Sequence, residues 1–134
     1  MSDTKQILVV DDDEQLTLGV KIRLEASGYQ VVTAFNGRQA LEQVGQQIPD
    51  LILLDVMMPL MDGYSCLREL NRCFGRSRIP VIIFTARDHM KDLFELEGIE
   101  DYVVKPFEHD DLLMRIDRAL KRRASNASKG GSAK

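Results

Sequence analysis

Residues 5–13 read KQILVVDDD, in which the unbroken apolar run ILVV (7–10) leads into three aspartates. Because the run is short and does not alternate with polar residues, it predicts a strand buried on both faces over residues 5–10. Strands of this kind occur in parallel sheets that carry helices on both sides. The three aspartates would then stand at the carboxyl end of a central strand.

Strand and helix signals alternate along the rest of the chain. Leu16, Val20 and Leu24 recur at helical spacing, and Ser27-Gly28 predicts the end of that helix. Further strands are predicted at residues 29–34, 51–55, 79–84 and 102–104, and further helices at residues 36–47, 62–74, 87–97 and from about residue 108 onward. Asn36 and Asp62 are the predicted N-caps. Five strand–helix units of this length predict an α/β fold with a parallel sheet, joined by right-handed crossovers.

Length and composition favour one domain. The chain has 134 residues, of which 44% are hydrophobic and 29% charged. The hydrophobic fraction is enough to form a core, and the composition is not that of a disordered or collagen-like chain. We expect the domain to span residues 1–123, and residues 124–134, which lack an apolar pattern, to form a disordered tail. No apolar run approaches the ~20 residues of a membrane span, and we expect a cytoplasmic protein.

Charge is distributed unevenly. The net charge is -3, yet residues 115–134 hold seven basic groups and one acid, for +6, which leaves the remainder at -9. A basic end is compatible with nucleic acid or an anionic membrane, but basic side chains in the last turns of a helix also complement its dipole. We favour the helix interpretation and expect no direct nucleic-acid or membrane binding.

Polar residues follow the predicted strands at the edge where ligands bind in such sheets. In chain order they are Asp11, Asp12 and Asp13, then Asp55, Thr85 and Lys105. Taken singly, the first acids suit a helix start, Thr85 suits a cap, and Lys105 suits a surface ion pair. Together they predict a cleft whose carboxylates need a cation, and Mg²⁺ prefers such oxygen ligands.

These residues lie in motifs that resemble the receiver domain of two-component response regulators. The motifs are ILVVDDD (7–13), DLILLDVMMPLMDG (50–63), VIIFTAR (81–87) and DYVVKPF (101–107), in this order and within residues 5–123. The resemblance implies a flavodoxin-like doubly wound sheet of five strands in the order 2-1-3-4-5 with five helices, an order for which chemotaxis receivers serve as a general example.

The resemblance also implies a role for each matching residue. It makes Asp55 the phosphoacceptor, Asp12 and Asp55 side-chain ligands of Mg²⁺, Met57 a ligand through its backbone carbonyl, Asp11 a support through water, and Thr85 and Lys105 the groups that contact the phosphoryl group. Tyr102 matches the switch aromatic that would move with Thr85, Met57 and Arg87 match positions that tune hydrolysis, and the bond before Pro106 is expected to be cis.

The implied activity is that of a switch rather than a conventional enzyme. A histidine kinase or phosphotransfer protein would supply the phosphoryl group, and a downstream protein target would read the change. A receiver-fold docking module that works without phosphorylation remains an alternative, as does a receiver fragment of a larger response regulator. An aspartyl-phosphate phosphatase is disfavoured because Gln15 stands where Thr or Val is needed, and a dinucleotide or flavin binder because no phosphate-cradling glycines follow the first strand.

One spacing departs from the commoner family pattern. The interval from Thr85 to Lys105 is shorter by about half a helical turn, which predicts a short or displaced helix in residues 87–97. Many receivers dimerise through that helix and the strand and helix that follow it. We therefore expect a monomer that dimerises at most weakly on activation.

Overall fold

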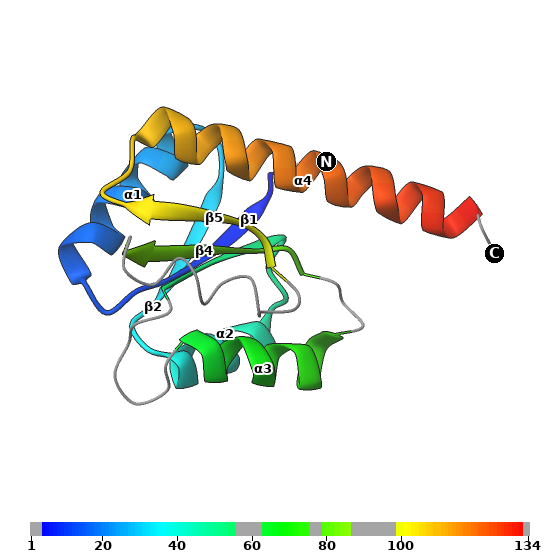
Figure 1. Ribbon diagram of the computed structural model, residues 1–134, viewed down its shortest axis with the longest axis horizontal. Helices are drawn as coiled ribbons and strands as arrows, with labels where there is room; N and C mark the ends of the chain where they lie inside the picture. Colours follow the sequence, from blue (N-terminus) through cyan, green and yellow to red (C-terminus); the bar gives the residue numbers. More distant parts are fainter. Residues whose placement is uncertain (1–3, 56–62, 76–78, 87–98, 133–134) are drawn as a thin grey trace.

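Five parallel strands form one sheet in the order β2-β1-β3-β4-β5 (Figure 1). The computed structural model describes residues 4–55, 63–75, 79–86 and 99–132. The strands are β1 (Gln6–Val10), β2 (Gln30–Ala34), β3 (Leu51–Asp55), β4 (Val81–Ala86) and β5 (Ile99–Lys105). The predicted fold class and strand order are therefore confirmed.

Four helices fall within the described residues: α1 (Glu14–Ala26), α2 (Gly37–Gln46), α3 (Gly63–Phe74) and α4 (His109–Ser132). The predicted helix over residues 87–97 and the predicted cap Asp62 lie outside the described residues. Asn36 caps α2 as predicted, since its Oδ1 accepts a hydrogen bond of 2.9 Å from the backbone N–H of Gln39. Gly28 follows α1 with φ at 99°, a conformation that favours glycine, so this turn requires it.

The helices cover the two faces of the sheet in pairs (Figure 1). One core cluster joins Leu8, Val10, Ile52 and Leu54 to side chains of α2 and α3. The other joins Ile7, Val9, Leu51 and Leu53 to side chains of α1 and α4. Successive residues of β1 and β3 thus enter opposite cores, because side chains alternate along a strand. This explains why both strands are apolar throughout.

The sheet edge at β5 differs from the prediction. β5 begins at Ile99 rather than at residue 102, and β4 extends to Ala86, which pairs with Lys105. Glu100 and Asp101 are polar and interrupt the apolar pattern, so the sequence predicts too late a start for this strand. On this partly exposed edge strand their carboxylates bind Arg122 and Arg115 of α4, at 2.7 and 2.8 Å.

The predicted disordered tail also differs, because α4 continues to Ser132. In Figure 1 this helix runs along the sheet and projects beyond it, away from the carboxyl ends of β4 and β5. Extending a helix that is already anchored costs less than starting one. Ala124 and Ala127 favour helix and no proline interrupts the segment. Among the helices described, none is both long enough and apolar enough to cross a membrane.

Candidate functional site

Three consecutive aspartates connect β1 to α1 and occupy three different environments. Asp11 is fully buried, and its Oδ1 accepts a hydrogen bond of 3.0 Å from the backbone N–H of Asp13. Asp12 is exposed. The Asp13 side chain caps α1 by accepting a hydrogen bond of 3.0 Å from the backbone N–H of Leu16. The two interpretations of this run, helix cap and acidic site, therefore apply to different members of it.

Asp55 ends β3 beside these aspartates. Its exposed fraction is 5%, so the carboxylate lies almost entirely within the protein. Oxygen atoms of Asp11, Asp12 and Asp55 lie within 4.8 Å of one another. Adjacent strands β1 and β3 position two of them, which is the convergence that the sequence predicts for the carboxyl edge.

Lys105 brings a positive charge into the same cluster from β5. Its Nζ lies 2.7 Å from Oδ2 of Asp11 and 3.4 Å from Oδ2 of Asp55. The Lys105 side chain is 27% exposed, so a solvent route to the ammonium remains. With all groups in their usual ionised forms, three carboxylates and one ammonium leave a net charge of about -2.

The acidic neighbours determine how Lys105 ionises. Burial is the largest single influence and lowers the pKa of Lys105, but the hydrogen bond with Asp11 and the charges of Asp11 and Asp55 together raise the pKa above its ordinary value. Lys105 therefore remains a cation at neutral pH despite its partial burial.

The structure describes three of the remaining predicted features and leaves two predicted residues undescribed. Thr85 lies in β4, where it pairs with Val104 next to the Ala86–Lys105 pair, so its backbone is at the carboxyl edge. Tyr102 lies in β5, partly buried against the α2 and α3 side of the core. The Lys105–Pro106 bond is cis, as predicted. Met57 and Arg87 lie outside the described residues.

Three residues near the site were not identified from the sequence. Thr17 is buried in α1, and its hydroxyl donates to the carbonyl oxygens of Asp13 at 2.8 Å and Asp11 at 3.4 Å. Phe84 and Phe107 lie next to Lys105, with ring centroids 5.2 Å apart. The available signals were a threonine on the buried face of a predicted helix and two aromatic residues next to predicted site residues. Phe84 directly precedes Thr85, and Phe107 directly follows Pro106.

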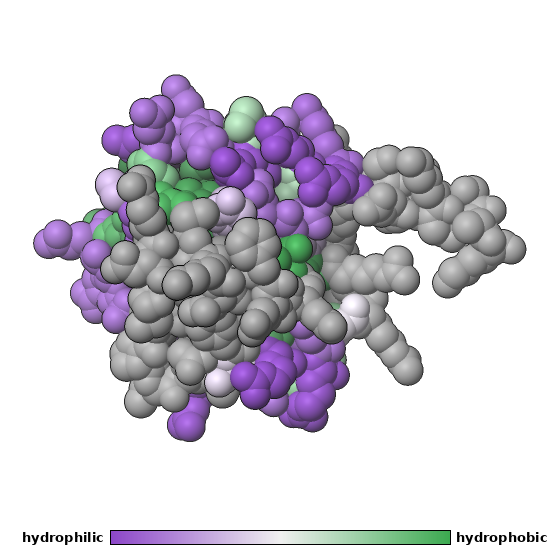
Figure 2. Space-filling model, in the orientation of Figure 1, coloured by the Kyte–Doolittle hydropathy of each residue, from purple (hydrophilic) through white to green (hydrophobic). Residues whose placement is uncertain are grey.

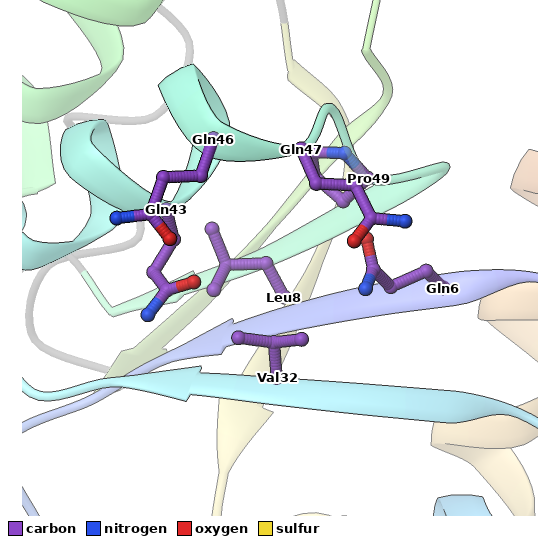
Figure 3. Close-up of a pocket in the computed structure, with 7 residues that line it drawn as sticks. All are labelled: Gln6, Leu8, Val32, Gln43, Gln46, Gln47 and Pro49. Atoms are coloured by element: carbon purple, nitrogen blue, oxygen red, sulfur yellow. The ribbon is translucent and has the colours of Figure 1, made fainter.

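Two pockets differ in how they relate to the cluster. A hollow of about 580 Å³ lies between α1 and the start of α4 and includes Lys105, Pro106 and Phe107 in its lining. A pocket of about 270 Å³ lies by the other end of β1, on the α2 side of the sheet (Figure 3). It is lined by Gln6, Leu8, Val32, Gln43, Gln46, Gln47 and Pro49. Because no lining side chain of this second pocket is charged, it offers neither carboxylate ligands for a metal nor a cation for phosphate.

On the face seen in Figure 2, the described residues are mostly hydrophilic, with smaller hydrophobic areas between them. Among the described residues, Asp11, Asp12 and Asp55 form the one group of three side chains placed to hold a metal ion. Its carboxylate oxygens suit a hard divalent cation, and Asp55 beside a lysine suits reaction with an electrophile that carries negative charge.

Comparison with known proteins identifies the class. The family model for the response regulator receiver domain matches residues 7–117. The chain therefore belongs to the response regulator receiver domain family. It is 45% identical over 124 residues to a probable transcriptional regulator ycf27 of Cyanophora paradoxa, covering 91% of this chain and 50% of that protein. It is 39% identical over 120 residues to the alkaline phosphatase synthesis transcriptional regulatory protein PhoP of Bacillus subtilis, covering 88% of this chain and 48% of that protein.

Solved receiver structures share the fold. The Francisella response regulator 1452 receiver domain matches with a TM-score of 0.81 at 34% identity, covering 90% of this chain and 99% of that one. The receiver domain of sensor histidine kinase PA1611 from Pseudomonas aeruginosa, solved with magnesium in its active site cleft, matches with a TM-score of 0.80 at 31% identity, covering 88% of this chain and 98% of that one. The chain spans about half the length of the curated relatives it matches.

Proposed function

We propose that this chain is a phosphorylation-activated signalling switch in which Asp55 accepts a phosphoryl group from a histidine kinase or phosphotransfer protein. The observation that carries the proposal is the position of Asp55. Asp55 is the last residue of the central strand β3, and its carboxylate is nearly buried. This carboxylate lies 3.4 Å from the Lys105 ammonium, within a cluster of acids. Such a carboxylate is oriented by its strand and needs little rearrangement before it reacts.

The transfer forms one bond and breaks one. A carboxylate oxygen of Asp55 attacks phosphorus while the bond from phosphorus to the donor's imidazole nitrogen breaks, and that nitrogen keeps the bonding electron pair. Negative charge accumulates on the transferred oxygens. The Lys105 ammonium lies close enough to Asp55 to offset that charge, and the Thr85 hydroxyl is the proposed second contact.

The residues present suit Mg²⁺. Asp12 and Asp55 would bind it through side-chain oxygens, Met57 through its backbone carbonyl, and Asp11 through a water molecule. The donor set is entirely oxygen, and the three carboxylates already lie within 4.8 Å of one another. When bound, Mg²⁺ neutralises phosphoryl oxygens and helps hold the donor in line.

The output of the switch is a change in partner binding. A phosphoryl group on Asp55 adds acceptor oxygens that would draw the Thr85 hydroxyl and allow Tyr102 to rotate inward. We propose a downstream protein target, slow hydrolysis controlled by Met57 and Arg87, and a cytoplasmic location. Two of the relatives are named as transcriptional regulators, one of them as a probable one, and this chain matches only about half of each, so in a longer protein the target of the switch would be an attached DNA-binding part.

Chemical labelling tests the proposal. Acetyl phosphate with Mg²⁺ should add one acid-labile phosphoryl group per chain, measured by intact mass spectrometry, and chelation of Mg²⁺ should prevent it. Asp55→Asn should abolish labelling while leaving the circular dichroism spectrum unchanged, because the amide keeps the shape but lacks the nucleophilic oxygen.

Asp13→Asn is the matched control. It removes a neighbouring carboxylate but preserves the cap of α1, since asparagine is as good an N-cap as aspartate. We expect it to be labelled like the natural sequence. Stoichiometric acid-labile phosphate on Asp55→Asn would contradict the assignment, and absence of labelling on the natural sequence would favour a docking module that works without phosphorylation.

A further inference from the structure

Lys105 has a third neighbour besides the two carboxylates. Its Nζ lies 5.7 Å from the centre of the Phe84 ring, within the range of a cation–π contact. A lysine side chain has four rotatable bonds and considerable freedom to move. Three groups, Asp11 directly after β1, Asp55 of β3 and Phe84 of β4, therefore surround one flexible ammonium.

The two carboxylates are unsuitable as permanent holders of Lys105. Asp11 and Asp55 belong to the proposed Mg²⁺ site, and Asp55 is also the proposed attachment point of the phosphoryl group. Their interactions with Lys105 must therefore change during the reaction. The ring of Phe84 carries no titratable or metal-binding group, so its attraction for the ammonium persists in every state of the site.

Phe84 is itself firmly fixed. Its exposed fraction is 0%, and in the sheet it lies opposite Asp55 of β3 and Val103 of β5. Its ring also stacks on that of Phe107, with centroids 5.2 Å apart and planes inclined by 10°. Both ends of the Lys105–Phe107 segment therefore contact the Phe84 ring. Lys105 does so through its ammonium, and Phe107 through its own ring.

We propose that Phe84, supported by Phe107, is a positioning residue that holds the Lys105 ammonium toward the oxygens of the group transferred to Asp55. The inference rests on the proposed function, in that Asp55 must be the acceptor for the positioning to affect the reaction. It adds an aromatic wall to the site, contributed by β4 and the segment after β5. Replacing the ring with an aliphatic side chain should leave Lys105 present but poorly placed.

A double-mutant cycle tests this. The rate of phosphorylation by acetyl phosphate is measured at saturating Mg²⁺ for the natural chain, Phe84→Leu, Lys105→Met and the double variant. Phe84→Leu should slow the reaction about three- to tenfold, the size expected for loss of a partly desolvated cation–π contact. With Lys105 replaced by Met, the same substitution should produce no further slowing, because Phe84 acts through Lys105.

Controls separate positioning from stability. Phe74→Leu removes an aromatic that packs in the other core and should leave the rate unchanged. The Mg²⁺ affinity of Phe84→Leu should match that of the natural chain, and urea unfolding reports how much folded protein is present. If Phe84→Leu fails to fold, Phe107→Leu, at a partly buried position, should give a smaller slowing that also disappears in the Lys105→Met background. Equal slowing in the two backgrounds, or no slowing in either, would overturn the inference.

A second readout is independent of phosphorylation. In the natural chain the Phe84 ring current should shift the NMR signals of the Lys105 ε-methylene, and Phe84→Leu should remove that shift. If the natural chain is never labelled but the ring-current shift is present, the proposed function fails while the placement of Lys105 stands. If labelling is normal and the shift is absent, the positioning role alone is wrong.

Discussion

Asp11, Asp12 and Asp13 show how neighbouring residues of one type acquire different tasks. The fold buries Asp11 against Lys105, exposes Asp12 at the edge of the cluster, and turns Asp13 back to cap α1. The sequence predicts the group but not this division, because the division depends on where β1 ends and α1 begins. The conformation of the connection between β1 and α1 determines where each of the three carboxylates points.

Magnesium binding should distinguish two of these aspartates. Asp12→Ala is expected to weaken Mg²⁺ binding by tenfold or more (about 1.4 kcal/mol per factor of ten) while scarcely changing stability without the metal, because the side chain is exposed. Asp13→Ala should do the reverse, costing about 1 kcal/mol of stability through loss of the cap with little effect on affinity. Isothermal titration and urea unfolding measure the two quantities. Unchanged Mg²⁺ titration of Asp12→Ala would count against its role as a ligand.

At the scale of elements, α4 is attached to β5 by ion pairs as well as by its apolar face. Arg115 binds Asp101 of β5 at 2.8 Å and Asp111 of its own helix at 3.0 Å. Arg118, one turn further on, contacts only the sulfur of Met114 among the interactions described, at 3.7 Å. The two arginines lie on one helix and provide a matched comparison.

Arg115→Ala should destabilise the chain by about 0.5–1.5 kcal/mol, since the pairs are partly shielded from water and use two guanidinium nitrogens. Arg118→Ala should stay within about 0.5 kcal/mol of the natural chain. Urea unfolding of the two variants is the measurement. Equal loss in both would mean that helix propensity and alkyl packing, rather than the ion pairs, account for the effect.

Tyr29, which lies just before β2 and packs in the core shared with α4, should make the stability of the chain depend on pH in the alkaline range. Burial raises the pKa of Tyr29, and the charge of Asp117 raises it further against the opposing charge of Lys121. A raised pKa means that folding favours the neutral phenol. The stability that this provides is complete below the ordinary tyrosine pKa of about 10 and is lost as pH rises through the higher folded value.

Tyr29→Phe removes the titrating group and should therefore lose less stability than the natural chain as pH rises beyond about 10. Thermal unfolding at a series of alkaline pH values compares the two proteins. Parallel curves for the two would show that the phenol of Tyr29 does not contribute to alkaline unfolding.

The elements that the sequence predicted well are those whose local pattern matches their environment. β1 and β3 are apolar on both faces because both faces are buried, and Asn36 caps α2 through contacts within four residues. The start of β5 was missed because Glu100 and Asp101 are stabilised by arginines of α4, far along the chain. Likewise Phe84 and Phe107 become neighbours only when β4 and β5 pair, so no local pattern marks their contact with Lys105.

At the scale of the whole molecule, the acidic cluster and the far end of α4 lie at opposite ends of the sheet (Figure 1). Six of the seven basic residues in 115–134 belong to α4, which ends at Ser132, and Lys134 lies outside the described residues. Arg115 and Arg118 lie in the first half of this helix rather than in its last turns, so the helix dipole alone does not account for the basic charge. The domain boundary at residue 123 stays a prediction, since α4 passes through it without interruption.

The same ion pairs bear on the oligomeric state. The edge formed by β5 and α4 is where many receivers pair, and the shortened interval from Thr85 to Lys105 predicts that the helix contributed by residues 87–97 is short. In this chain Arg115 and Arg122 already bind Asp101 and Glu100 of the same molecule, at 2.8 and 2.7 Å. Exchanging these contacts for equivalent ones in a second copy would gain little free energy, because each new pair replaces an existing one.

We therefore expect a chain that remains mainly monomeric when activated. Sedimentation velocity with Mg²⁺, in the presence and absence of beryllofluoride, is the measurement, since beryllofluoride imitates the phosphoryl group on Asp55. Asp55→Asn is the control, because it lacks the carboxylate oxygen that beryllofluoride would bind. A tight symmetric dimer through Arg115 and Arg118 in the activated natural chain, absent from the control, would contradict the expectation. It would mean that activation releases Arg115 from Asp101 so that the arginine can bind a second copy.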